Sequence, residues 1–599
     1  MPHASFDNSG NGTLNGPFFV RQILTTLDPN TSAITRAVSL TGTMTFDGNG
    51  NYTFSGQELD SSKGSTPASF NASGTYAVAS SGLVQIQSAI DNTDTEFGGV
   101  GGAKEIVASA TEGPYDDIFV AIPAGPASGV QGSYQVGFID FLQGNGSNVR
   151  DGFFNMTAAG GSFGNVTVTG SMANQNNTQA TQNLSNVTFS FNGTTGTIVF
   201  PTASNPSTAL VSGSKTFAVS TDGNILVGGN PGGFDLFVGL KTSSSVTNGT
   251  FSGTYFTGAL ENDTSGSCGN SNCIDSFYGS VAATGQGSGT QHARDVGFDF
   301  SAYDYTSDVA YNFPSSGVFN DGTFQWMLGA NGEAVMQVGT GNFYTLILGV
   351  QAKAITGSGL SVNPDGVVNS ASFAPITNSV APGEYVALFG SSLATNGNAA
   401  SLPLPTNLGN SQATVNGTLA PLLATSPVLI TGLVPNATPA YAYATFQVSS
   451  SGSTSNPVTL YTAATAPGVF TSTANGIGPA DLFHLNYTYV TQSSPMTAGE
   501  SLFFYATGLG ATNPVVADGA AAPSTQPLAA VTDTNLAVDF FDSQGNVTTA
   551  NVSFAGLVPG LAGVYQVNIT VPSGVASGMG YLEVNTTDGY TSQAKVFMK

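Results

Sequence analysis

The chain has 599 residues, which is too long for a single hydrophobic core. Apolar residues make up 40% of it, so packed domains are expected despite a net charge of −24. Only 8% of the residues are charged, and the 11 lysines and arginines are scattered. This composition argues against nucleic acid and anionic membrane surfaces as partners, and the lack of a long apolar run argues against membrane insertion.

The first part of the chain repeats one pattern three times. Each copy opens on a glycine followed by an aromatic-rich strand, beginning at Gly16, Gly132 and Gly253. Each copy then places an aromatic residue six positions before a turn glycine, and closes on an apolar strand. The aromatic and glycine pairs are Tyr76 and Gly82, Phe217 and Gly223, and Trp326 and Gly332; the closing strands are 118–122, 236–240 and 346–350. Repetition of this kind is typical of modular architectures.

Turn chemistry and alternation predict strands throughout. Asp47-Gly48-Asn49-Gly50 and Asp222-Gly223-Asn224 are typical of β-hairpin turns. Apolar residues alternate with polar ones over 565–571. Glycine and proline interrupt the chain too often for long helices. The sequence therefore predicts an all-β protein of tandem β-sandwich or β-barrel modules.

A second pattern begins after a short linker near residue 355. The segment 381–390 recurs as 497–506, and 431–435 recurs as 555–559. These offsets fit two sandwich domains of immunoglobulin size. We therefore expect five modules in series, with β repeat modules at 1–124, 125–243 and 244–355 and immunoglobulin-like domains at 360–468 and 469–599.

The last two modules carry a family resemblance. The motifs that carry it, in order, are 367–373, 381–384, 388–390, 466–470, 505–510 and 565–572. In that order they resemble the uncharacterised C-terminal region of secreted acidobacterial proteins, over about residues 360–599. The segment 439–443 departs from that pattern, because a Gln-Val-Asn-like strand is expected there. The resemblance implies export and two immunoglobulin-like domains, and it implies no activity.

The front half resembles the glycine-rich β repeats of exported proteins from the same bacteria, through 42–53 and 73–78. The N-terminal residues 1–7 lack the cationic and apolar regions of a signal peptide. The protein is then either cytosolic or has a leader outside this numbering. Because the resemblance implies export, we expect the second: an extracellular or cell-surface protein whose leader lies outside this numbering.

Cys268 and Cys273 are separated by four polar residues. In an oxidising compartment this spacing predicts a disulfide that closes a tight loop. The alternative is two free thiols in a loop.

Calcium is the small partner that the sequence favours. Asp47, Asn49, Asn51 and Glu58 present oxygen ligands at spacings similar to those of an EF-hand loop. Flanking helices are absent and the sixth position is Tyr52 instead of glycine, so a plain hairpin turn is the alternative.

An acidic and aromatic strip in the third repeat is a candidate ligand-binding site. Asp299, Tyr303, Asp304 and Tyr305 lie on a predicted strand, where rings could stack on sugars and carboxylates could accept their hydroxyl protons. Trp326 and Tyr344 are further candidates for sugar stacking. The alternative is a polar edge over a core face.

Three functional hypotheses follow. The first is an extracellular structural or adhesive protein that self-associates, as the subunit of a surface filament joined through β-strand edges. The second is a secreted protein that binds glycans or extracellular polysaccharide. The third is a glycoside hydrolase with a carboxylate pair that no motif reveals. No catalytic constellation is found, because the three histidines lie in separate parts of the chain. We therefore expect a protein that is not an enzyme.

Overall fold

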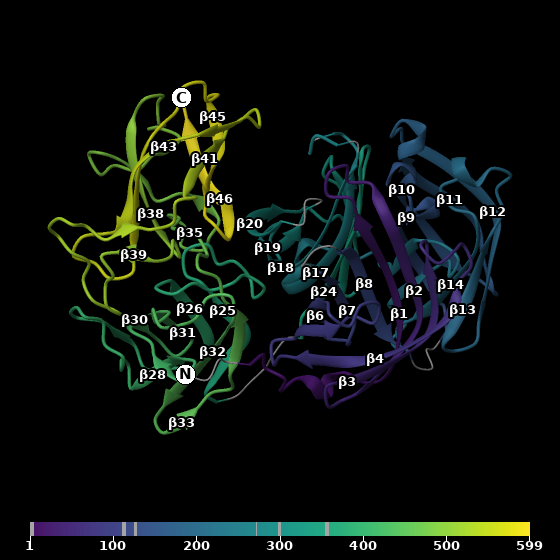
Figure 1. The fold of residues 1–599 in the computed structure, drawn as a ribbon, viewed down its shortest axis with the longest axis horizontal. Coiled ribbons are helices and arrows are strands. Elements are labelled where there is room, and N and C mark those ends of the chain that lie inside the picture. The colour runs from purple at the N-terminus through teal and green to yellow at the C-terminus, as the bar shows by residue number, and fades with distance from the viewer. Residues whose placement is uncertain are drawn as a thin grey trace.

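The computed structural model describes residues 5–110, 115–124, 129–266, 268–270, 272–297, 301–353 and 359–599. These residues form β-strands and short 3₁₀ turns, with no α-helix among them. The prediction of an all-β protein with several modules is confirmed. In Figure 1 the first three modules lie on the right and the last two on the left.

The first module is a closed eight-stranded barrel in which β8 returns to pair with β1. Phe18, Phe46 and Tyr76 pack inside it. Its strands are β1 (Asn15–Leu27), β2 (Ile34–Asp47), β3 (Asn51–Asp60), β4 (Ala68–Val78), β5 (Leu83–Gln87), β6 (Thr95–Val100), β7 (Ile106–Ala110) and β8 (Tyr115–Pro123).

The second module is another closed barrel, in which β16 pairs with β9. Tyr134, Phe154 and Phe217 pack inside it. Its strands are β9 (Gly132–Phe141), β10 (Val149–Ala158), β11 (Ser162–Met172), β12 (Ala180–Phe191), β13 (Thr195–Phe200), β14 (Gly213–Val219), β15 (Ile225–Gly229) and β16 (Asp235–Lys241).

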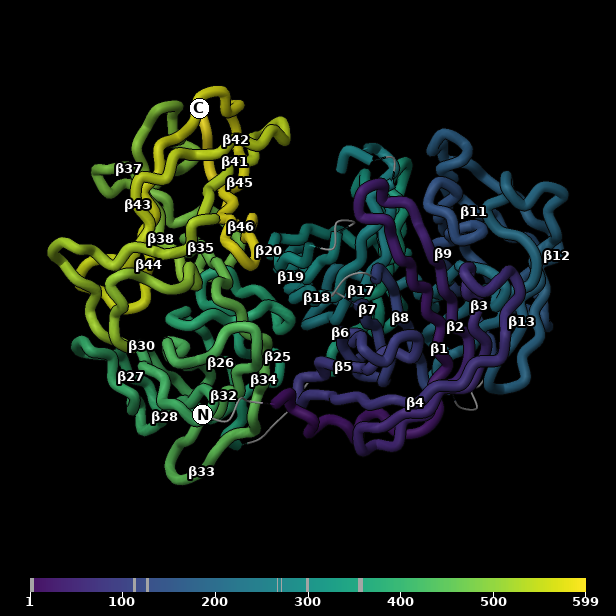
Figure 2. Tube along the Cα trace, in the orientation of Figure 1, coloured from purple at the N-terminus to yellow at the C-terminus, as the bar shows by residue number. Residues whose placement is uncertain are grey.

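The third module repeats this strand order, but its barrel is open. Its fourth strand, β20, pairs in parallel with the last strand of the chain, β46 (Gly589–Met598), so that both belong to one 13-stranded sheet. Figures 1 and 2 show β46 beside β20. The strands are β17 (Ser252–Asp263), β18 (Cys273–Thr284), β19 (Ser288–Val296), β20 (Ala302–Ala310), β21 (Val318–Asn320), β22 (Phe324–Leu328), β23 (Ala334–Gly339) and β24 (Phe343–Gln351).

The apolar closing strands of the repeats are buried on both faces. In β8, Phe119 and Ala121 point into the first barrel, whereas Ile118, Val120 and Ile122 join a core shared by the three barrels. A strand buried on both sides needs an almost continuous apolar sequence, which explains why these strands do not alternate.

The three barrels pack as a ring. The first strand β1 contacts β15 and β16 of the second barrel, β9 contacts β23 and β24 of the third, and β17 contacts β6, β7 and β8 of the first. The expectation of modules in series is therefore wrong for the arrangement in space. The outward faces of the closing strands are apolar, and contact between barrels is what buries them.

The turn glycines of the repeats have a structural reason. Gly82, Gly223 and Gly332 have φ values of 92°, 78° and 76°, in the left-handed region that glycine adopts without strain. The hydroxyls of Tyr134 and Tyr255 donate to the carbonyls of Gly223 and Gly332, at 2.7 and 2.6 Å. In the second and third barrels, this hydrogen bond therefore ties the first strand to the turn glycine at one end of the barrel.

The fourth module consists of two sheets, ordered β25-β26-β31-β30-β27 and β29-β28-β32-β33, with β34 also on β32. Its strands are β25 (Ser361–Asn369), β26 (Tyr385–Ser391), β27 (Gly397–Asn398), β28 (Ser411–Val415), β29 (Thr418–Leu419), β30 (Leu422–Thr425), β31 (Leu429–Leu433), β32 (Tyr443–Ser450), β33 (Ser453–Thr454) and β34 (Val458–Tyr461).

The fifth module also has two sheets, one of which continues the open barrel through β46. Leu502, Phe504, Val567 and Leu582 belong to its core. Its other strands are β35 (Gly468–Val469), β36 (Gly478–Pro479), β37 (Leu482–His484), β38 (Ser501–Thr507), β39 (Thr512–Asn513), β40 (Ala530–Val531), β41 (Ala537–Phe541), β42 (Val547–Thr549), β43 (Asn551–Leu557), β44 (Tyr565–Thr570) and β45 (Gly578–Asn585).

Candidate ligand-binding site

A cleft rich in aromatic side chains lies where the first, third, fourth and fifth modules meet. It has a volume of about 420 Å3. We call it the aromatic cleft, and its lining side chains with rings or charges are Phe97, Tyr278, Arg294, Asp304, Tyr441, Tyr443, Tyr461 and Asp588.

Strand alternation explains why these side chains face the cleft. In β6, Glu96 is buried, so its neighbour Phe97 points out of the first barrel. In β18, Phe277 packs with Ala259 and Ala293 in the third barrel, so Tyr278 points outward. The cleft is thus built from the outer faces of two barrels and covered by the fourth module.

The rings contact one another in a continuous group. Phe97 stacks on Tyr278 with ring centroids 5.8 Å apart, and Tyr461 approaches both rings edge-on, at 6.0 and 6.2 Å. Tyr443 lies 6.0 Å from Tyr461, and its hydroxyl accepts a hydrogen bond from Gln85 at 3.0 Å. Such contacts fix the positions of the rings relative to one another.

A charged group forms one wall. Asp304 lies 3.4 Å from both Arg294 and His292, and Ser379 donates to it at 3.5 Å. Burial raises the pKa of Asp304, but the contacts with His292 and Arg294 outweigh burial, so that the pKa lies below its ordinary value. Asp304 is therefore a carboxylate at neutral pH, able to accept hydroxyl protons.

Tyr441 stands at the entrance with 72% of its surface exposed. Its hydroxyl donates to Asp588 at 2.8 Å, and Asp588 also accepts from the backbone of Thr465 at 2.8 Å. An exposed ring held by one hydrogen bond offers a flat apolar face beside polar groups. This combination suits a sugar, whose ring has an apolar face and a hydroxyl rim.

A larger cavity, of about 580 Å3, lies between the fourth and fifth modules. Small residues such as Ala464, Gly510 and Ala517 line it. Its one ring is Tyr565, which is buried and donates to the carbonyl of Gly510. This cavity has no exposed stacking face, so we favour the aromatic cleft as the functional site.

The predicted acidic and aromatic strip is divided between two faces of β20. Asp304 lines the aromatic cleft, whereas Tyr303 and Tyr305 point to the opposite face and stack on Tyr590, at 6.1 and 5.7 Å. Asp299 lies outside the described residues. The strip is therefore not one binding surface, because neighbouring strand residues face opposite ways.

Trp326 and Tyr344 are not sugar platforms. Both are buried; Trp326 donates to Asp321 at 2.7 Å and Tyr344 donates to Asn177 at 2.8 Å.

Of the four predicted calcium ligands, Asp47, Asn49 and Asn51 share one hairpin turn, but Glu58 lies apart from them. Asp47 accepts from the backbone of Asn49 and Asn51, at 2.7 and 3.0 Å, as part of a hairpin turn. Glu58 lies seven residues along β3 from Asn51, a span of ~23 Å at ~3.3 Å per residue, and pairs with Lys63 at 2.8 Å. The segment 47–51 is therefore a plain hairpin turn, which was the alternative to a calcium site.

Cys268 and Cys273 form a disulfide, as predicted. Cys268 precedes β18, and Cys273 is its first residue.

Three acidic side chains lie close together in the third barrel. Glu261 lies opposite Asp275, and Asp295 is in the next strand, β19. Burial raises the pKa of both Glu261 and Asp295 to about 7. None of these three carboxylates lines the aromatic cleft.

Sequence reasoning missed seven of the eight cleft residues with rings or charges: Arg294, Asp588 and the rings of Phe97, Tyr278, Tyr441, Tyr443 and Tyr461. A signal existed for two of them. Tyr441 and Tyr443 lie in the segment 439–443 that departs from the pattern of the resembled C-terminal region. An aromatic pair placed where another strand motif is expected indicates a local role. The other three rings alternate with core residues and carry no such signal.

No family model and no curated protein matches the chain. A solved structure from the DUF3598 family of Nostoc punctiforme, of unknown function, matches 58% of this chain and 100% of its own. Its sequence identity is 8% and its TM-score is 0.12, which is too low to support an argument about this protein.

No helix within the described residues has the length and apolar character needed to cross a membrane.

Proposed function

We propose that this protein is an extracellular adhesive protein that binds polysaccharide in the aromatic cleft. The observation that carries the proposal is the exposed ring of Tyr441 beside the Asp588 and Asp304 carboxylates and Arg294. Stacking on the ring and hydrogen bonds to the charged groups would together select a sugar over a purely apolar ligand.

Export is part of the same proposal. It is supported by the resemblance of residues 360–599 to secreted proteins and by the disulfide between Cys268 and Cys273, since disulfides persist in oxidising compartments. We also propose that the two-sheet modules at 360–468 and 469–599 are immunoglobulin-like, on the strength of that resemblance. Binding, and not glycoside hydrolysis, is the proposed activity.

The test compares two exposed tyrosines. Full-length protein is screened against soluble cello-, xylo-, chito- and malto-oligosaccharides by isothermal titration, and against the insoluble polysaccharides by pull-down. Tyr441→Ala should weaken binding by about tenfold, because a stacked ring contributes ~1.5 kcal/mol. Hydrolysis is monitored in the same samples, and no release of reducing ends is expected.

Tyr487→Ala is the matched control. Tyr487 is 74% exposed and has positive φ, like Tyr441, but it lies in the fifth module against Phe503. The proposal fails if no sugar binds the wild type, or if both variants lose binding equally.

Assembly into a filament through strand edges stays a prediction. The two closed barrels have no open edge, and β20, the edge of the open barrel, is occupied by β46. The short strand β21 is an edge that remains. Electron microscopy of the native particle tests this prediction, and single particles at high concentration would contradict it.

A further inference from the structure

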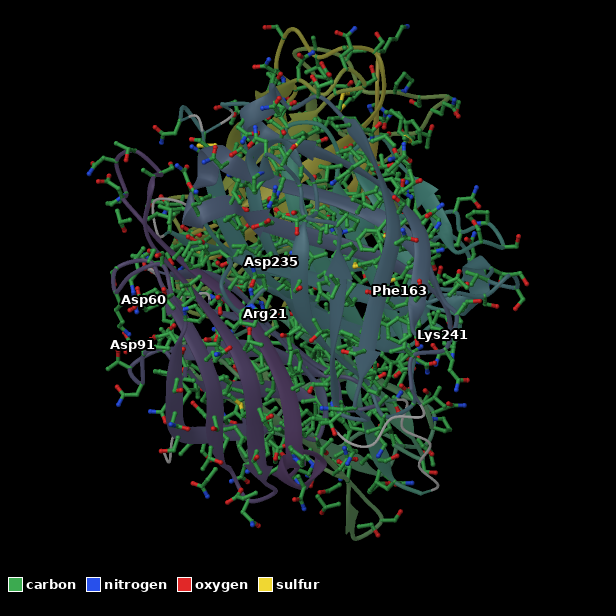
Figure 3. All side chains as sticks on the ribbon, turned by 90° about the vertical axis from the view of Figure 1, so that its right-hand side faces the viewer. Arg21, Asp60, Asp91, Phe163, Asp235 and Lys241 are labelled. Carbon is green, nitrogen blue, oxygen red and sulfur yellow. A yellow bond between two sulfur atoms is a disulfide. The ribbon has the colours of Figure 1, made fainter. Side chains whose placement is uncertain are left out.

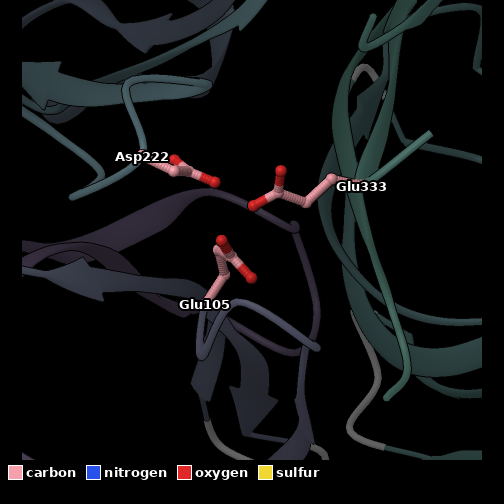
Figure 4. A group of neighbouring side chains, drawn as sticks. All are labelled: Glu105, Asp222 and Glu333. Carbon is pink, nitrogen blue, oxygen red and sulfur yellow. The ribbon is translucent and has the colours of Figure 1, made fainter. Parts of the chain in front are cut away.

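Three carboxylates, one from each barrel, meet at one end of the ring. Glu105 directly precedes β7, Asp222 lies in the turn before β15, and Glu333 directly precedes β23. These three strands hold the same place in their barrels. One oxygen of each residue lies within 4.8 Å of an oxygen of the other two. Figure 4 shows the three side chains converging from separate loops.

Glu105 is a buried carboxylate without a hydrogen-bond partner. Its side chain is 1% exposed, and both of its carboxylate oxygens are buried without a hydrogen-bond partner. It points toward Glu333, whose Oε1 is likewise buried and unpartnered. Buried carboxylate oxygens are normally hydrogen-bonded or bound to a metal, because burial without a partner is costly.

The surrounding groups do not neutralise the three acids. Asn224 donates to both Asp222 and Glu333, each at 2.8 Å, and Asn331 donates to Glu333 at 2.6 Å. No ion pair within the described parts of the chain joins a lysine or arginine to any of the three carboxylates. The cluster is thus a concentration of negative charge held by neutral amides.

We propose that Glu105, Asp222 and Glu333 bind one calcium ion that fastens the three barrels together at the end of the ring. Calcium prefers oxygen ligands at about 2.3–2.6 Å, so ligand oxygens on opposite sides of the ion lie up to ~5 Å apart. The oxygens here are within that span. The absence of sulfur and imidazole in the cluster disfavours zinc and copper.

The competing arrangement is a proton shared by Glu105 and Glu333. Without a cation, burial and the neighbouring Glu333 raise the pKa of Glu105 to about 9. A shared proton and a calcium ion would both neutralise the pair, so the experiment must separate them.

The test uses the full chain after dialysis against a chelator, at pH 7.5. Calcium chloride is titrated by calorimetry, and the melting temperature is followed in parallel. We expect one bound ion and a rise in melting temperature. Asp222→Asn, which removes one carboxylate at an exposed position and keeps the size of the side chain, should weaken calcium binding on the order of tenfold or more. Glu105→Gln should abolish the calcium-dependent rise in melting temperature, because the buried ligand of the proposed site has been removed.

Asp47→Asn is the control. It removes a carboxylate from the hairpin that the sequence analysis proposed as a calcium site, and it leaves Glu105, Asp222 and Glu333 intact. It should bind calcium like the wild type. The proposal is overturned if calcium gives neither heat nor a thermal shift, which is the outcome for a shared proton. It is also overturned if Asp222→Asn binds as well as the wild type, or if magnesium binds and calcium does not.

Discussion

Arg21 shows how far apart in sequence the partners of a buried charge can be. Its side chain is fully buried, and it donates to the backbone carbonyls of Asp235, Asn230 and Gly233 at 2.8, 3.1 and 2.9 Å. It also pairs with the Asp235 carboxylate at 3.3 Å. Figure 3 labels the two residues close together. Arg21 therefore joins the first barrel to the second across 214 residues of sequence.

Replacing Arg21 with methionine should destabilise the protein by about 3 kcal/mol, because a buried ion pair is broken. This value is at the low end for such a change, since Lys215 still pairs with Asp235 in the variant. Urea unfolding measures the change. Lys63→Met is the control: that side chain is 62% exposed, so the change should stay below ~1 kcal/mol. Equal effects of the two substitutions would contradict this role for Arg21.

The equivalent positions in the other barrels hold glycine. Arg21 lies opposite Val120, Gly137 opposite Val238 and Gly258 opposite Leu348, each on the closing strand of its own barrel. A Cβ at Gly137 would lie 2.5 Å from Val338, and one at Gly258 would lie 2.7 Å from Val107. At the scale of the strands, the glycine backbone of one barrel therefore lies close to a valine of the next barrel at two of the three interfaces, Gly137 to Val338 and Gly258 to Val107. At the third interface, between the first and second barrels, Arg21 makes the contact.

Gly137→Val should destabilise the contact between the second and third barrels by about 1–3 kcal/mol, because the added carbons have no space. Gly12→Val is the control, since a Cβ there meets nothing within 4 Å. Thermal unfolding of both variants provides the measurement. A melting temperature for Gly137→Val equal to that of the control would show that the interface can relax.

Local patterns predicted the closing strands and the turn glycines, because each depends on a few neighbouring residues. They did not predict the open edge of the third barrel. The parallel pairing of 304–306 with 589–591 depends on how the fifth module docks. Strand pairing between distant segments leaves no mark in either segment alone.

At the scale of the whole molecule, buried acids make stability depend on pH. Glu261 and Asp295 have pKa values of about 7 in the folded protein, against about 4 when unfolded. Burial is the main cause. The titratable groups near Asp295 are Tyr303, Tyr305, Tyr590, Asp275, Glu261 and Asp116.

Because the folded pKa is raised, the stabilising effect of protonation is complete below pH ~4 and is lost as the pH rises toward about 7. The melting temperature in chelator should therefore fall between pH 4.5 and 7.5. Asp295→Asn should reduce the slope, since one of the titrating groups is gone. Differential scanning calorimetry provides the measurement, and a flat profile, or an unchanged slope in the variant, would contradict the assignment.

The sequence by itself determined the all-β class, the threefold repeat and the turns that close it, because alternation, glycine placement and apolar runs are local properties. Only the tertiary structure decided the rest. The packing arranges the first three modules as a ring and places Asp304 on the opposite face of β20 from Tyr303 and Tyr305. It also brings Tyr441 next to Asp588 and Glu105 next to Glu333. Both candidate sites are built from several modules, and contacts between modules depend on packing that no single stretch of sequence encodes.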